Sequence, residues 1–93
     1  MQINVLNPAV SFNKTSDTFS AELSDLQGVY PELYPEVMRG KSIDLYNPRS
    51  GKVLKATQVE VHQDPSGEDT YGWLYHAYNP ENGRNIKFLF IND

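Results

Sequence analysis

The chain has 93 residues, of which 39% are hydrophobic and 22% are charged, and none is a cysteine. This length fits a single domain, residues 1–93, and the missing cysteines exclude disulfides, thiolate metal sites and cysteine nucleophiles. The net charge of −4 argues against a dedicated nucleic-acid binder, whose surface is usually strongly basic. No apolar run approaches the roughly 20 residues that span a bilayer and no signal-peptide pattern is present, so we expect a cytoplasmic protein without membrane contact.

Residues 1–27 carry three short segments with strand character. These predicted strands are Met1–Leu6, Val10–Asn13 and Thr18–Leu23. Asn7-Pro8 and Lys14–Asp17 suit the turns between them, and the second turn lets Phe12 face Phe19 in an N-terminal hairpin.

The last part of this region has an alternative interpretation. A helix over residues 20–27 would begin at Ser20 as its N-cap, end at Gly28 and place Leu23 and Leu26 on one side. The fold would then be α+β. The β-branched and aromatic start at Thr18 favours a strand for the first residues of the segment.

Residues 28–41 form a crossover that contains a tandem Tyr-Pro-Glu-aliphatic unit. Its two prolines, four residues apart, disfavour one continuous helix, because Pro35 lacks an amide hydrogen and crowds the preceding turn. Proline is well suited to the first position of a helix. We therefore expect one short helical turn that begins at Pro35 and ends at Gly40.

Residues 42–93 are predicted to form a four-stranded antiparallel meander. Its strands are Ser42–Asn47, Lys52–Gln63, Thr70–Asn79 and Arg84–Ile91. The first and third connections share the pattern Tyr-Asn-Pro-x-x-Gly-basic, and the second is Asp64-Pro65-Ser66-Gly67. Asn or Asp, Pro and Gly in this order are typical of tight hairpin turns.

The turns also predict which residues face the core. Pairing Asp64 with Glu68 places Val61 opposite Tyr71, and pairing Asn79 with Arg84 places Tyr75 opposite Phe88. Both registers place the same residues of the third strand on one apolar face of the sheet. Its predicted members are Thr57, Val59, Val61, Tyr71, Trp73, Tyr75, Ala77, Ile86, Phe88 and Phe90.

The first hairpin of the meander conflicts with this face. Pairing Asn47 with Lys52 puts Ile43 opposite Ala56, so the even-numbered residues of the second strand would face the core in this hairpin. Val59 and Val61 are odd-numbered and would point to the other face. A bulge near residues 56–57 or a coiled strand would reconcile the two sets. We therefore expect a mainly β fold with a bent long strand, either a small partly open barrel or an antiparallel meander with the N-terminal hairpin packed across it.

Charge is unevenly distributed along the chain. Residues 1–37 hold five acids and one base, so they account for the whole net charge. Residues 38–93 hold seven of each sign, and the two Asn-Pro turns are locally basic.

Few residues in this chain form a pattern associated with catalysis or with metal binding. His62 and His76 are not predicted to face each other across strands, and the acids of the Asp64 turn do not follow a calcium-loop pattern. No phosphate loop, dinucleotide fingerprint or serine nucleophile elbow occurs. We therefore predict no enzyme activity, no metal site and no cofactor.

Exposed tyrosines beside basic turn residues are the strongest candidates for binding. Tyrosine near arginine or lysine is favoured at protein interfaces and also resembles a stacking surface for single-stranded nucleic acid. This candidate binding set is Tyr46, Tyr78, Arg49, Lys52, Arg84 and Lys87. Candidate interface residues are Tyr30 and Tyr34 of the Tyr-Pro-Glu repeat, and Leu74, Leu89 and Ile91, which make the last strands apolar on both faces.

These features predict a small protein-binding module that acts as an accessory or inhibitory protein. Its partner would be another protein, or a second copy that forms a homodimer through a sheet edge or the outer face. The excess of apolar surface in the last strands requires cover from the N-terminal segment or a subunit interface. The alternative function is a small β-barrel that binds single-stranded nucleic acid through the same turns.

Overall fold

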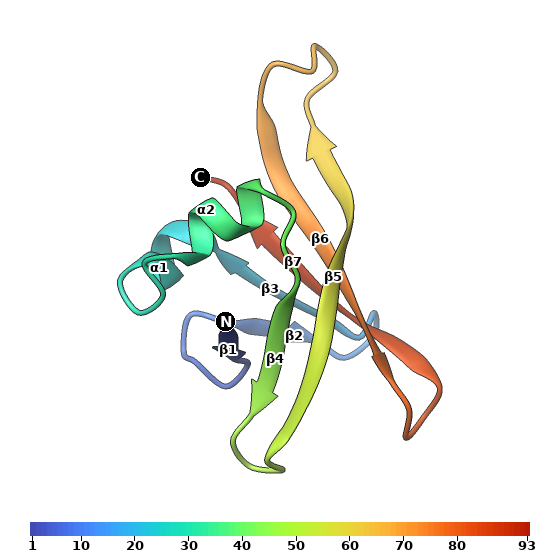
Figure 1. Cartoon of the computed structure of the whole chain (residues 1–93). Coiled ribbons are helices and arrows are strands. Elements are labelled where there is room, and N and C mark those ends of the chain that lie inside the picture. Colours follow the sequence, from blue (N-terminus) through green and yellow to red (C-terminus); the bar gives the residue numbers. More distant parts are fainter.

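Seven strands and two short helices make up the chain, and the computed structural model describes all residues from 1 to 93 (Figure 1). The strands are β1 (Gln2–Asn4), β2 (Ser11–Asn13), β3 (Thr18–Glu22), β4 (Ile43–Asn47), β5 (Lys52–Gln63), β6 (Thr70–Asn79) and β7 (Arg84–Ile91). The helices are α1 (Leu23–Gln27) and α2 (Leu33–Met38). Strands β5, β6 and β7 begin and end at the residues that the turn chemistry predicts.

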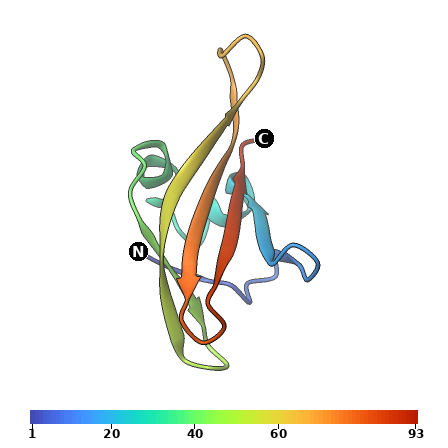
Figure 2. The same ribbon diagram turned by 90° about the vertical axis from the view of Figure 1, so that its right-hand side faces the viewer.

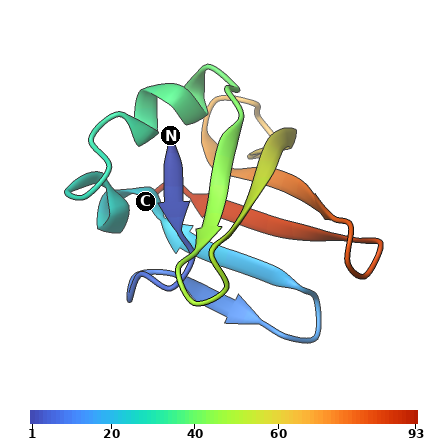
Figure 3. The ribbon, with the colours of Figure 1, turned by 60° about the horizontal axis from the view of Figure 1, so that its bottom comes forward.

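All strands belong to one sheet, in the order β1-β4-β5-β6-β7-β3-β2. The four strands from β4 to β7 form the predicted antiparallel meander. The sheet curls into a half-barrel, and both helices lie against its inner face (Figure 3). The prediction of a mainly β fold with a partly open barrel is therefore confirmed.

The N-terminal strands extend the sheet at both of its ends. β2 and β3 form the predicted hairpin, in which Phe12 lies opposite Phe19 with ring centroids 4.5 Å apart. β3 then pairs in parallel with β7, and β1 pairs in parallel with β4. The sheet is therefore mixed, and the hairpin lies beside β7 instead of packing across the meander. This arrangement places Phe19 next to Phe88 on the inner face.

Residues 18–27 contain both a strand and a helix, so each of the two interpretations is partly right. β3 ends at Glu22 and α1 begins at Leu23, three residues after the predicted N-cap Ser20. Gly28 caps the helix as expected. Leu23 and Leu26 are buried, because the single helical turn lays both side chains on the core.

Helix α2 (Leu33–Met38) begins two residues before the predicted turn and ends two residues before Gly40. It begins at Leu33, so Pro35 occupies the first turn, where its missing amide hydrogen would have no partner within the helix. Leu33 and Val37 are fully buried, and Gly40 follows the helix with φ of 69°. With five and six residues, neither helix could cross a membrane.

Two of the three predicted hairpin registers are confirmed. Ile43 lies opposite Ala56 in β4–β5, and Tyr75 lies opposite Phe88 in β6–β7. In both connections the amide of the turn glycine, Gly51 or Gly83, donates to the carbonyl of the asparagine that precedes proline. Both glycines have φ near 70°, a left-handed conformation that closes the four-residue turn.

The predicted register of β5–β6 is wrong. Val61 lies opposite Trp73 instead of Tyr71, a displacement of two residues. One residue comes from the turn, which is longer than a three-residue loop because the Asp64 amide donates to the Asp69 carbonyl. The other is Tyr71 itself, an extra residue on β6 between Thr70 and Gly72, which lie opposite Gln63 and His62. The carboxylate of Asp64 accepts hydrogen bonds from the Ser66 hydroxyl and the Glu68 amide, so Asp64 does not pair with Glu68 across the hairpin. These hydrogen bonds, the one from Ser66 foremost, also hold the pKa of Asp64 below its usual value.

The bend in β5 is a β-bulge, as predicted in kind but not in position. The register shifts between Gln58 and Glu60, so Val59 is the extra residue, and shifts again between His62 and Gln63. The first bulge brings Ala56 and Val61 to the same face, which reconciles the even and odd apolar sets. Gln58, expected on the outer face, consequently lies opposite Tyr75 on the inner face.

The predicted core face is right near β7 and wrong at the far end of β5. The buried members of this face are Trp73, Tyr75, Ala77, Phe88 and Phe90, and Ile86 is half-buried. Thr57, Val59, Val61 and Tyr71 are exposed. Thr57 is exposed because it lies on the outer face, opposite His76. Val59, Val61 and Tyr71 are exposed because β5 and β6 continue past the core as a projecting hairpin, residues 59–72, which we name the arm (Figures 1 and 2).

Candidate functional site

The two Asn-Pro turns come together at one end of the sheet. Lys52 of the β4–β5 turn forms an ion pair with Glu81 of the β6–β7 turn. Within each turn the asparagine side chain, Asn47 or Asn79, accepts a hydrogen bond from the amide two residues later. The predicted turns are therefore neighbours, held by local hydrogen bonds and by one ion pair between them.

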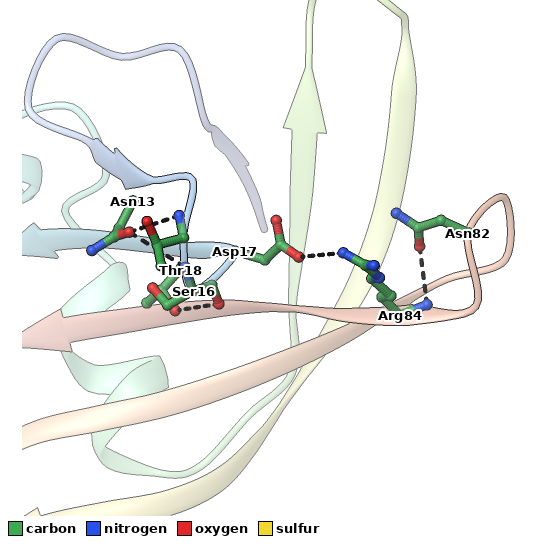
Figure 4. Close-up of polar contacts among 7 residues, drawn as sticks. Asn13, Ser16, Asp17, Thr18, Asn82 and Arg84 are labelled. Carbon is green, nitrogen blue, oxygen red and sulfur yellow. Dashed lines mark hydrogen bonds and ion pairs between the residues drawn. The ribbon is translucent and has the colours of Figure 1, made fainter.

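The basic residues of these turns are largely paired with acids. Besides Lys52, Arg84 contacts Asp17 of the β2–β3 turn, with Nη1 3.6 Å from Oδ2 (Figure 4). Lys87 is half-buried on β7, and Arg49 is exposed with no ion pair. Two of the four bases thus have a carboxylate beside them, which weakens the attraction of this end of the sheet for phosphate.

Tyr46 and Tyr78 do not form a shared surface. They lie on β4 and β6 with β5 between them, and no ring contact joins them. Tyr46 is half-buried and lies opposite Val53, whereas Tyr78 is exposed and lies opposite Asn85. The structure brings the two turns together but not their tyrosines.

An apolar groove of about 250 Å³ opens on the inner side of the two turns. Its apolar wall consists of Val5, Phe19, Leu45, Leu54 and Ile86, and its rim includes Lys52 and Glu81. The ion pair between these two rim residues lies across the mouth of the groove. The sequence carries no signal for this groove, because its walls come from β4, β5 and β7 and from N-terminal residues that are distant in the chain.

The predicted interface residues divide into structural and exposed ones. The Tyr30 hydroxyl accepts a hydrogen bond from the Asn4 amide at 2.9 Å, and its ring packs against the core. The outer face carries three half-buried apolar residues, Leu74, Leu89 and Ile91. β3 covers only the edge of β7, and both helices pack on the inner face, so none of these elements lies over the three side chains. The N-terminal segment therefore does not bury these three side chains completely.

Tyr34 belongs to a second groove, between α2 and the base of the arm. Its ring meets Trp73 edge to face, with centroids 6.5 Å apart. The groove has a volume of about 440 Å³ and adjoins a smaller hollow beside α1 that shares Tyr34 and Asp93. We name it the arm groove; its apolar side chains are Tyr34, Met38, Tyr71 and Trp73, and its acids are Glu68, Asp69 and Asp93.

The electrostatic character of the arm groove is negative throughout. Neither the groove nor the adjoining hollow contains a lysine, arginine or histidine among its lining residues. The charge of Asp93, followed by that of Asp25, raises the pKa of the nearby Glu22 carboxyl above its ordinary value. Glu22, Asp25 and Asp93 therefore add negative charge beside the arm groove.

Strand lengths were the sequence signal for the arm groove. β5 has twelve residues and its neighbour β4 has five, so the far half of β5 has no strand on one side. Such an overhang predicts a projecting hairpin, and Tyr71 together with Glu68 and Asp69 lies on it. Met38 and Asp93 carried no comparable signal, because only the folded chain brings them to the arm.

Neither histidine belongs to a cluster suited to metal binding. His62 lies opposite Gly72 and its Nε2 is 3.2 Å from Glu60 Oε2, while His76 lies between Thr57 and Lys87. No group of three or more His, Asp or Glu side chains gathers at ligating distance. The two histidines are not cross-strand partners, as predicted.

Comparisons with protein-family models, with curated proteins and with solved structures found no match. The function is therefore argued from the surface of this chain. Of the two grooves, the arm groove is the larger and the more strongly charged.

Proposed function

We propose that this chain is a non-enzymatic protein-binding module and that its arm groove docks a segment of another protein. The observation that carries the proposal is the groove itself, in which exposed apolar side chains stand beside three carboxylates and no base. The partner segment that fits this chemistry presents an apolar side chain flanked by lysine or arginine.

The apolar side chains supply the contact area of the proposed interface. Tyr71 and Met38 are each more than half exposed, so a partner that covers them removes apolar surface from water. Tyrosine and methionine are enriched at protein interfaces, and the flexible methionine adapts to different partner shapes. Trp73, buried beneath them, gives the groove a rigid floor.

The charges supply orientation and selectivity. A lysine or arginine beside Tyr34 or Tyr71 gains a cation–π contact, and its charge also meets Glu68, Asp69 or Asp93 at the rim. The same carboxylates repel phosphate groups. This repulsion, with the ion pairs of Lys52 and Arg84, favours a protein partner over the alternative of single-stranded nucleic acid.

Titration with two synthetic peptides tests this proposal. We expect a peptide of alternating leucine and lysine to bind, and its counterpart of leucine and glutamate not to bind. Trp73 is the only tryptophan and lines the groove, so its fluorescence reports occupancy directly. Binding should weaken as salt is added, since exposed charges are screened beyond about 8 Å at physiological ionic strength.

Two tyrosine substitutions locate the site. Tyr71→Ala should weaken binding of the lysine peptide about tenfold, the typical effect of losing an aromatic anchor. Tyr78→Ala is the matched control, because Tyr78 is 60% exposed and Tyr71 is 54% exposed, but Tyr78 lies on the outer face near the turns. Equal losses in both variants, or equal binding of both peptides, would contradict the proposal.

A further inference from the structure

One long edge of the sheet carries no partner strand. β4 pairs with β5 only from Lys52 to Ala56, and Glu60 to Gln63 pair with β6 on their other side, with Val59 as the extra residue of the bulge. No other backbone hydrogen bond and no side-chain hydrogen bond reaches the backbone of residues 59–63. The amide and carbonyl groups that point away from β6 are therefore free along this edge (Figure 1).

The other free edges of the sheet are short. The end strands β1 and β2 have three residues each, and short edge strands are one way in which proteins avoid unwanted pairing. The edge at residues 59–63 has the sequence Val-Glu-Val-His-Gln, without the lysine or proline that commonly protects an edge. Val59 and Val61 are both exposed on it.

We propose that this edge pairs antiparallel with the same edge of a second copy, about a two-fold axis at Val61. Val61 then faces Val61 of the second copy, Glu60 faces His62, and Val59 faces Gln63. The free amide and carbonyl groups gain partners, and the exposed valines pack across the junction. The two copies form one continuous sheet.

Side-chain complementarity between a carboxylate and an imidazole N–H selects this register among the alternatives. Residues directly opposite each other must share a face, and Glu60 and His62 both lie on the outer face, opposite Leu74 and Gly72 of β6. An axis at Glu60 would oppose two glutamates, and an axis at His62 would oppose two histidines. Of these three axes, only the one at Val61 places a carboxylate opposite an imidazole, twice in each dimer.

The symmetry of the pairing has a consequence for the arm groove. A two-fold axis perpendicular to the sheet keeps both inner faces on the same side. Both copies therefore present their arm grooves on one face of the joined sheet. This dimer is independent of the proposed partner, because β5 carries the edge while α2 and β6 carry the groove.

Sedimentation of the full chain tests the dimer. The junction is small compared with the roughly 1,600 Å² of a standard interface, so we expect reversible association between about 10 µM and 1 mM. Val61→Lys should abolish association over this range. Val53→Lys is the matched control, since Val53 lies on the same strand with 43% exposure against 44% for Val61 but is paired with β4.

A charge swap tests the register. His62→Glu places two pairs of glutamates in opposition and should remove the dimer, whereas the double variant Glu60→Lys with His62→Glu restores unlike pairs and should recover it. A wild-type chain that stays monomeric at 1 mM overturns the proposal, as does equal association of the two lysine variants or of all charge variants. Tyr71→Ala should leave the dimer intact, so failure of the groove and failure of the edge are distinguishable.

Discussion

Phe88→Ala should lower the free energy of unfolding by about 3–5 kcal/mol, the range typical of a large aromatic side chain lost from a core. Phe88 is fully buried on β7, where its ring stacks on Phe90 with centroids 4.4 Å apart and on Phe19 at 5.9 Å. Tyr75 lies opposite it on β6. Because β7 joins the meander to β3, the cavity would open where the two parts of the sheet meet.

Thermal and urea denaturation measure this loss. A domain of this size has a total stability of about 5–15 kcal/mol, so the substitution removes a large share of it. At roughly 4–8 °C per kcal/mol, the Tm should fall by at least about 12 °C. Phe12→Ala is the control, since Phe12 contacts the same ring of Phe19 but lies on an exposed edge strand.

The control also defines the result that would contradict the structure. Phe12→Ala should cost no more than about 1 kcal/mol, because the ring is already partly in water and leaves no closed cavity. Equal losses from the two substitutions would mean that Phe88 is not enclosed between the meander and β3. The parallel pairing of β3 with β7 would then be wrong.

Local chemistry explains why much of the meander could be predicted from sequence. The Asn-Pro-x-x-Gly connections close by short hydrogen bonds within the turn, so the registers that place Ile43 opposite Ala56 and Tyr75 opposite Phe88 follow directly. The Asp64 connection contains the same residue types. Its aspartate bonds to Ser66 and Glu68 instead of closing a three-residue loop, and composition does not distinguish the two outcomes.

Long-range pairing and exposure were harder to predict. The parallel contact of β3 with β7 joins residues about 70 positions apart, and strand pattern alone does not specify a neighbour at that distance. Trp73 was correctly placed in the core by its alternation with Tyr75. Tyr71 follows the same alternation in the sequence, but it is an extra residue at the second register shift and lies on the arm, beyond the end of α2, so it is exposed.

A partly buried hydrogen-bond network around Tyr75 explains how α2 and its connection to β4 are held over the sheet. The Tyr75 hydroxyl donates to the carbonyl of Lys41 at 2.9 Å and accepts from Gln58 Nε2 at 3.2 Å. Gln58 Nε2 also donates to the carbonyl of Val37 at the end of α2. Removal of the hydroxyl leaves the Lys41 carbonyl without its partner in a site that Tyr75 shields from water.

Tyr75→Phe should therefore lower the free energy of unfolding by about 1–2 kcal/mol at neutral pH. Tyr78→Phe is the matched control and should change stability little, because Tyr78 is exposed and its hydroxyl makes no hydrogen bond within the chain. Urea denaturation of both variants at pH 7 measures the difference. An equal effect of the two substitutions would contradict the network.

The same hydroxyl makes stability depend on alkaline pH. Burial raises the pKa of Tyr75 above its ordinary value near 10. The hydrogen bond from Gln58 partly offsets this increase, and the negative charge of Glu36 adds to it. The unfolded chain then loses the phenol proton at lower pH than the folded chain does. The contribution of Tyr75 is complete below about pH 10 and is lost as pH rises from there through the raised pKa of the folded state. Tyr75→Phe lacks this group, so the stability gap between wild type and variant should narrow as pH rises above about 10. A gap that stays constant would show that the hydroxyl ionises equally in both states.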